Sequence, residues 1–148
     1  MPEEEPVERA REDKREGKSP STQAGEFVRE EMEHIREGEH GARSPEQAIA
    51  IGLSKARRAG VELPPPKRGK KRTKRQAKRD LAKGLKGSRK KVSRTRSRAT
   101  KRALKREPRR SASKKALSRR AKQAAARRSA RSRSAAAKKA ARTRKRRL

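Results

Sequence analysis

Residues 44–60, SPEQAIAIGLSKARRAG, carry both the start and the stop signals of a single helix. Ser44 is a preferred N-cap residue, Pro45 suits the first helical position, and Gln47 completes a capping box with Ser44. At the far end, Gly60 follows two arginines and an alanine, which is typical of a helix C-terminus. These signals predict one helix that fills most of this stretch.

This predicted helix has one apolar face, which another element must cover. The members of the face recur at helical spacing, and a hydrophobic contact just past the final glycine would extend it. The face consists of Ala48, Ile49, Gly52, Leu53 and Ala56, with Val61 as the residue beyond the glycine. We expect the segment before residue 44 to supply the cover.

That preceding segment predicts a second helix. Ser21 or Thr22 can cap it, and it runs to about Glu37, where Gly38 ends it. Its apolar residues are Phe27, Val28, Met32 and Ile35. Residues 21–60 are therefore predicted to form a small helical hairpin. Because its core holds few large apolar side chains, we expect marginal stability, with self-association through these helices or a bound partner adding to it.

Two short segments flank the hairpin. Residues 1–20 form a charged arm, in which acids and bases interleave at helical spacing and predict a solvated helix from Pro6 to Glu16. Residues 61–66, VELPPP, contain three consecutive prolines, which favour an extended backbone and predict a semi-rigid linker. The hairpin is thus predicted to be set apart from the residues that follow position 66.

The remaining residues, 67–148, are a basic tail of low complexity. They hold 39 Lys and Arg but only two carboxylates, whereas residues 1–66 hold 11 bases and 15 acids. Ala, Lys and Arg favour helix, but like charges repel and few large apolar groups are present to form a core. The predicted fold is therefore mostly disordered and otherwise all-α: a small helical hairpin with a tail that becomes helical on a polyanion.

A net charge of +33 indicates a polyanionic partner. Each base that meets a phosphate releases counterions, so about ten contacts give a log–log salt slope of about −9. The tail has no aromatic residue to stack on single strands and no rigid scaffold for base readout. The predicted function is binding and compaction of duplex DNA without sequence specificity.

The tail bases expected to contact phosphate are spread over its whole length. Many lie in recurring units such as KRALKR at residues 101–106 and KKALSR at residues 114–119. A short basic run is usually just solvated, but a run of this length needs a polyanion to offset its self-repulsion. The predicted contact residues are Lys70, Lys71, Arg72, Lys74, Arg75, Lys101, Arg102, Lys105, Arg106, Lys114, Lys115, Arg119, Arg120, Arg127, Arg128, Lys138, Lys139, Arg144, Arg146 and Arg147.

Other classes of function lack the residues they require. The sequence has no cysteine, no glycine-rich phosphate loop and no Ser-His-Asp set, so we expect neither enzyme activity nor a cofactor. No apolar run reaches the length of a membrane span or resembles a secretory signal. We therefore expect a cytoplasmic protein that associates with the nucleoid and not with membranes.

The two histidines are candidate metal ligands. His34 and His40 lie near two glutamates in the sequence, Glu37 and Glu39. Their spacing matches no standard metal motif, and Gly38 interrupts the helix between them. On this basis no bound metal is expected.

The stretch from Thr22 to Pro66 resembles a small bacterial family of uncharacterised proteins, which combine an SxxQAIAIGLSxARRAG helix with a basic Ala/Lys/Arg tail. The match is closest from Ser44 to Gly60. Members are often labelled DNA-binding or plasmid-stabilisation proteins, so the resemblance implies such a role here. The composition of the tail is also similar to linker-histone tails and to bacterial histone-like proteins.

Some alternatives stay open at the level of sequence. Basic tails also enter folded RNA, so an RNA- or ribosome-associated protein is the alternative function. A membrane-active helix would need a Trp, Phe or Leu face opposite its charges, and the tail holds only five leucines. In the motif helix, Lys55, Arg57 and Arg58 either complement the helix dipole or contact phosphate, and the sequence favours neither role.

Overall fold

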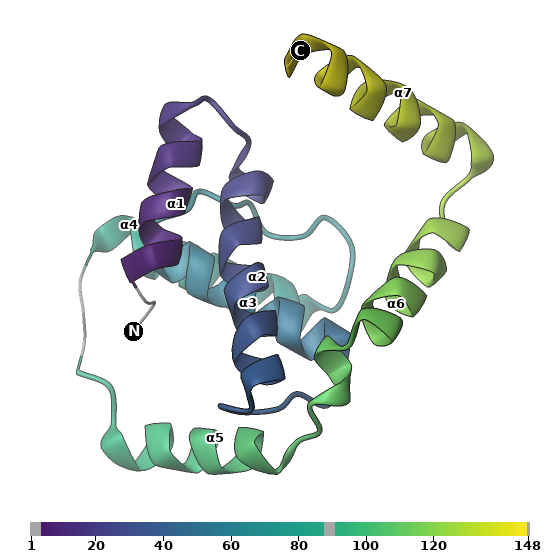
Figure 1. The fold of residues 1–148 in the computed structure, drawn as a ribbon. Coiled ribbons are helices and arrows are strands. Elements are labelled where there is room, and N and C mark those ends of the chain that lie inside the picture. The colour runs from purple at the N-terminus through teal and green to yellow at the C-terminus, as the bar shows by residue number, and fades with distance from the viewer. Residues whose placement is uncertain (1–3, 88–90, 148) are drawn as a thin grey trace. The chain divides into compact units, whose positions relative to one another are not determined.

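The computed structural model describes residues 4–87 and 91–147; the parts of the expected arm and tail at residues 1–3, 88–90 and 148 lie outside the described residues. The secondary structure of the described residues is entirely helical (Figure 1). Two compact units are present, Met1–Ser113 and Lys114–Leu148. The elements are α1 (Glu4–Arg15), α2 (Pro20–Glu37), α3 (Pro45–Arg58), α4 (Lys71–Lys86), α5 (Arg94–Arg106), the short 3-10 helix η1 (Arg110–Ala112), α6 (Lys114–Ala126) and α7 (Ala130–Arg147).

The expectation of a mostly disordered chain is wrong. Helices cover most of the described residues, and α4, α5, α6 and α7 all lie within the basic tail. Ala, Lys and Arg lose little side-chain freedom in a helix, and solvent and salt screen the repulsion between exposed charges. Helix propensity therefore outweighs like-charge repulsion here, and the chain is an all-α protein.

α2 and α3 pack closely because small residues line their contact. Ala48, Gly52 and Ala56 recur every fourth residue along α3 and are buried. A Cβ atom at Gly52 would lie 2.7 Å from the Cα of Val28 in α2, so only glycine permits this approach. The predicted apolar face is therefore correct in its position, but its small residues form the buried centre, and its two large members, Ile49 and Leu53, are only half-buried.

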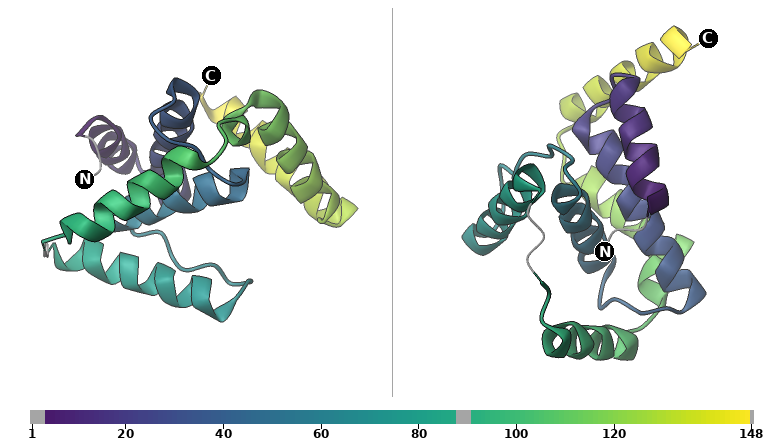
Figure 2. Two further views of the ribbon diagram at one scale, coloured as in Figure 1. Left: turned by 90° about the horizontal axis from the view of Figure 1, so that it is seen from below. Right: turned by 90° about the vertical axis from the view of Figure 1, so that its left-hand side faces the viewer.

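The core of the first unit lies between α1, α2 and α3, and Phe27 is its largest member. Its buried residues are Ala10, Ala24, Phe27, Ala56 and Val61. Ala10 belongs to α1, which lies alongside α2 (Figure 1, Figure 2). The helix expected in the charged arm is thus present, but it is packed and not solvated. Phe27 is fully buried within the unit.

The ends of α3 follow their sequence signals. The Ser44 side chain accepts a hydrogen bond from the backbone N–H of Gln47 at 3.2 Å, and the Gln47 side chain accepts one from the backbone N–H of Arg43 at 2.6 Å. At the other end Gly60 takes a positive φ of 100°. The N–H of Val61 then donates to the carbonyl of an earlier turn, which closes the helix.

The start of α2 lies earlier than the sequence predicted. Ser19 is its N-cap, and Pro20 occupies the first helical turn. The expected caps, Ser21 and Thr22, are inside the helix. Proline at the first position needs no N–H partner and is already set for helical geometry, so it moves the start toward the N-terminus. The predicted end is confirmed, because Gly38 has a left-handed φ of 86°.

α4, the first helix of the basic tail, packs on α3. Its buried residues are Ala77 and Asp80. Asp80 is only 1% exposed and accepts hydrogen bonds from the hydroxyl of Ser54 at 2.7 Å and from Nε of Arg58 at 2.9 Å. The tail, expected to start at residue 67, therefore begins within the first compact unit.

The proline-rich segment is held against the end of α3. Nε and Nη2 of Arg57 donate to the carbonyl oxygens of Leu63 and Pro64, both at 3.1 Å. Gly84 of α4 lies so close to this helix end that a Cβ atom there would collide with the carbonyl oxygen of Arg57. Residues 61–66 thus connect two packed helices of one unit.

The chain after α5 returns to the loop between α2 and α3. The N–H of Gly41 donates to the carbonyl of Leu104 at 2.8 Å, and the N–H of Ala42 donates to that of Pro108 at 3.1 Å. Nε of Arg36 donates to the carbonyl of Ala112 at 2.9 Å. These hydrogen bonds attach the segment from the end of α5 to η1 to the rest of the first unit, which ends at Ser113.

The second unit consists of α6 and α7. None of the described residues of these two helices is classed as buried. Residues 114–148 hold sixteen Lys and Arg and no acidic residue. Because no apolar core fixes them, the alanine-rich sequence of α6 and α7 maintains their helical form through local propensity.

Candidate nucleic-acid interface

The twenty predicted contact bases lie on α4, α5, α6 and α7 or directly beside them. All are exposed except Lys74 and Arg120, which are half-buried. Arg120 has an interaction within the protein. None of the others forms an ion pair with a carboxylate of the described residues. Their charges are thus available to solvent, and a role in binding nucleic acid stays a prediction.

The packing of α4 on α3 gives α4 one basic side. At 3.6 residues per turn, the side opposite Ala77 and Asp80 faces away from α3. This outer side consists of Arg72, Arg75, Arg79 and Lys86, all exposed. Arg79 was not among the predicted contact bases. Its spacing of four residues from Arg75 would have indicated it once Asp80 was known to be buried.

α6 and α7 present bases on every side. α7 spans 18 residues and is therefore about 27 Å long. It carries nine Lys and Arg. A duplex of that length carries roughly 16 phosphates. Whichever side of α7 faces a duplex, several bases lie within reach of phosphates.

Three bases at the end of α3 have partners within the protein. Nζ of Lys55 lies 2.7 Å from Oε2 of Glu31, and Arg58 is paired with Asp80. Arg57 holds the proline-rich segment, and burial lowers its pKa while the charge of Asp80 opposes that shift. These three side chains therefore stabilise the packing around the end of α3. The sequence had suggested two other roles for them, interaction with the helix dipole and contact with phosphate.

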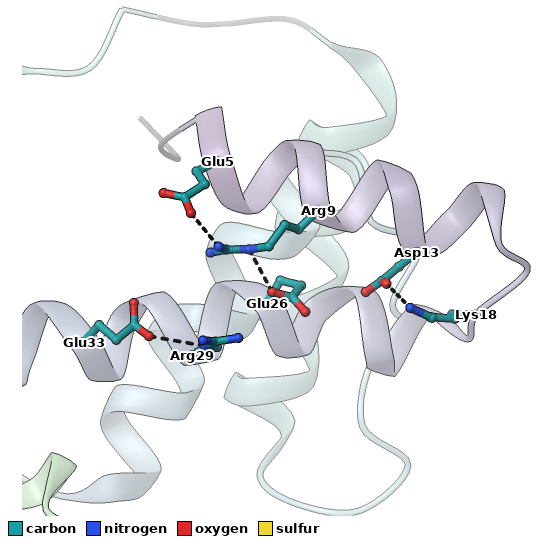
Figure 3. Close-up of polar contacts among 7 residues, drawn as sticks. All are labelled: Glu5, Arg9, Asp13, Lys18, Glu26, Arg29 and Glu33. Carbon is teal, nitrogen blue, oxygen red and sulfur yellow. Dashed lines mark hydrogen bonds and ion pairs between the residues drawn. The ribbon is translucent and has the colours of Figure 1, made fainter. Parts of the chain in front are cut away.

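Acidic and basic side chains of the N-terminal helices form ion pairs with one another. Figure 3 shows ion pairs within α1, within α2, between the two helices and across the turn that joins them. The pairs are Arg9–Glu5 (2.6 Å), Arg9–Glu26 (3.0 Å), Lys18–Asp13 (2.6 Å) and Arg29–Glu33 (3.2 Å). The hydrogen bonds to Asp13 and Glu16 raise the pKa of Lys18 above its ordinary value. Many charges of residues 1–66 are thus paired within this segment, which holds 15 acids and 11 bases.

Both carboxylates of residues 67–148 are directed toward the N-terminal helices. Asp80 contacts Arg58, and Oε1 of Glu107 lies 3.8 Å from Nη2 of Arg43. The Glu107 side chain is 27% exposed. The outward surfaces of α4, α5, α6 and α7 are therefore almost free of negative charge.

One buried cluster contains groups that bind metals. Glu31 and His34 of α2 and His40 of the following loop each place one donor atom within 4.8 Å of the others. Sequence reasoning paired the histidines with Glu37 and Glu39 and missed Glu31. Residues 31 and 34 lie one turn apart on α2, and this spacing was the available signal.

No described helix has the length and apolar character that crossing a membrane requires. The fold and its charge distribution define a helical protein with a mildly acidic N-terminal half and a strongly basic C-terminal half. Residues 15–68 match a family of unknown function (DUF6496), little more than a third of the chain. No curated protein and no solved structure matches the chain.

Proposed function

We propose that this protein binds duplex DNA without sequence specificity and compacts it, as a histone-like protein of the nucleoid. The observation that carries the proposal is that the exposed surface of residues 67–148 is almost entirely positive. Their two carboxylates are directed at Arg58 and Arg43, while their bases remain exposed on four helices. Such a surface attracts phosphate at any position along a nucleic acid.

Binding without base readout is favoured because no buried residue fixes the orientation of α6 and α7. Sequence-specific contacts in the major groove commonly use Asn, Gln or Arg on a helix that a scaffold positions. α6 and α7 have no buried residue by which a scaffold could position them. Their lysine and arginine side chains fit contacts to the phosphates of the backbone, which carry no sequence information.

Duplex is favoured over single strands because aromatic platforms are missing. Phe27, the one aromatic residue of the chain, is fully buried. Proteins that bind single strands usually stack bases on exposed aromatic rings. Without base stacking, the affinity must come from ionic contacts between the basic side chains and the phosphates, which a regular double helix presents at high density.

The experiment is a titration of the full chain against fluorescent DNA duplexes of two unrelated sequences across a salt series. We expect equal affinity for both duplexes and a log–log salt slope of about −9, for about ten phosphate contacts. A preference for one sequence, or a slope near zero, contradicts the proposal. Structured RNA of equal charge is included, and tighter binding to it at physiological salt would identify the protein as an RNA-binding one.

A further inference from the structure

We propose that Glu31, His34 and His40 form a binding site for a divalent transition-metal ion of the Zn²⁺ type. This inference does not depend on nucleic-acid binding. Its starting point is the position of Glu31, whose side chain is 1% exposed. Glu31 lies four residues after Phe27 and four before Ile35, both fully buried. A carboxylate in the middle of an apolar stripe is unfavourable unless cations surround it.

Lys55 meets only one side of this carboxylate. Its Nζ lies 2.7 Å from Oε2 of Glu31. The other oxygen, Oε1, has no hydrogen bond to any described residue, although Nε2 of His40 is 2.8 Å away. The two atoms form an ion pair when the His40 ring is protonated, but they lack the geometry of a hydrogen bond. Two donor atoms this close can both bind one ion if they first move apart slightly, because each must direct its lone pair at the ion and not at the other donor.

The ring of His40 is oriented as metal-binding histidines usually are. Its Nδ1 lies 2.9 Å from the carbonyl oxygen of Gly41. When Nδ1–H donates to that carbonyl, the neutral ring carries its lone pair on Nε2, the atom beside Glu31. A hydrogen bond from the second ring nitrogen to a backbone carbonyl is the common support of a histidine ligand.

His34 completes the set from one turn further along α2. The His34 side chain is 11% exposed, and its ring lies 6.4 Å from that of His40, centroid to centroid, at 75°. All three donor atoms lie within 4.8 Å of one another. Bonds of about 2.1 Å to a tetrahedral ion require donor separations of about 3.4 Å. Binding one ion therefore requires Nε2 of His40 and Oε1 of Glu31 to move slightly apart and the more distant donor atoms to move closer.

The ligand types select the ion. Two imidazoles and one carboxylate suit Zn²⁺ and related transition metals, whereas Ca²⁺ and Mg²⁺ prefer oxygen ligands. Three protein ligands leave a fourth position for water. Glu39 lies at the edge of the site, with one carboxylate oxygen 3.8 Å from Nδ1 of His34.

Bound metal would fix a loop on which the first unit depends. His40 precedes Gly41 and Ala42, whose N–H groups hold the chain at Leu104 and Pro108. An ion that ties His40 to α2 reduces the freedom of this loop in the native state. Because the unfolded chain lacks the preformed site, the ion stabilises the folded protein by mass action.

The test uses the full-length protein, stripped of metal with EDTA and kept free of nucleic acid. Calorimetric titration with ZnCl₂ is expected to show one ion per chain, and added Zn²⁺ is expected to raise the unfolding temperature. Co²⁺ is expected to give the visible absorption bands of a four- or five-coordinate site with nitrogen ligands. Weak binding without a change in unfolding temperature, or a Co²⁺ spectrum like that of the hydrated ion, would overturn the proposal.

Variants assign the ligands. Glu31→Gln and His40→Gln are each expected to weaken Zn²⁺ binding by at least about tenfold. Glu37→Gln, which changes an exposed carboxylate of the same helix, is the matched control and should bind as the parent does. If Glu31→Gln fails to fold by circular dichroism, His40→Gln decides, because it alters a partly exposed residue of the loop. Unchanged affinity in His40→Gln refutes the site.

Discussion

Oδ1 of Asp80 lies 2.9 Å from Nε of Arg58, and this contact joins the first basic helix of the tail to α3. The two partners differ in environment, since Asp80 is 1% exposed and Arg58 is 51% exposed. Ser54 donates to the second oxygen of Asp80. The carboxylate is therefore satisfied at both oxygens, while much of the arginine remains in water.

Removing this carboxylate should loosen α4. We expect Asp80→Ala to lower the free energy of unfolding by about 1–3 kcal/mol, because half-buried Ser54 loses its acceptor while Arg58 stays solvated. Urea unfolding followed by circular dichroism measures the change. Glu62→Gln is the control, since its 3.7 Å pair with Lys14 is more than half exposed and should contribute less than about 1 kcal/mol. Equal effects of the two changes would contradict this account.

Two helical glycines should respond to alanine in opposite directions. A Cβ atom at Gly52 would lie 2.7 Å from the backbone of Val28, whereas one at Gly25 meets no atom within 4 Å. We expect Gly52→Ala to separate α2 from α3 and to cost about 1–3 kcal/mol. Gly25→Ala should stabilise the protein by about 0.5–1 kcal/mol, because alanine is the better helix former. Thermal unfolding of both variants tests the close packing.

The contribution of Lys18 to the stability of the protein should depend on pH only in alkaline solution. Its hydrogen bonds to Asp13 and Glu16 raise its pKa above the ordinary 10.5. A raised pKa means that the contribution to stability is complete below pH 10.5 and is lost as the pH rises through the value of the folded state. We expect Lys18→Met to be less stable than the parent at neutral pH, with a difference that shrinks only above pH 10.5. Urea unfolding at several pH values measures it, and a difference that vanishes near neutrality would contradict the prediction.

The elements that local signals specify were predictable from the sequence. Ser44, Gln47 and Gly60 define α3 through hydrogen bonds within a few residues, so its ends needed no knowledge of the rest of the fold. Gly38 ended α2 for the same reason. The start of α2 was placed too late because Pro20 outweighed Ser21 as a start signal.

Long-range packing could not be predicted in the same way. Composition predicted a disordered tail because residues 67–148 hold few large apolar groups. α4 instead packs through Ala77, Asp80 and Gly84, which are small or polar and therefore add nothing to a count of large apolar groups. The cluster of Glu31 with His40 also depends on the path of the loop after Gly38. In both cases helical spacing shows which residues share a face, but it does not show which distant segment meets that face.

The structure shows which basic residues on the outer side of α4 should be changed to test the proposed DNA contact. Arg75 and Arg79 lie one turn apart on that side, away from α3. If both contact phosphate, the double variant Arg75→Gln, Arg79→Gln should reduce the steepness of the log–log salt slope by about 1.8. Glutamine is a good helix former, so α4 should stay folded.

The matched control for this variant removes the same charge from the other half of the protein. Arg11 and Arg15 are exposed on α1, where acidic residues surround them. Changing both to glutamine lowers the net charge by the same two units. We expect its salt slope on duplex DNA to equal that of the parent. If the two double variants change the slope equally, binding responds to net charge alone and α4 presents no particular contact surface; a change confined to the α4 variant places phosphate at that helix.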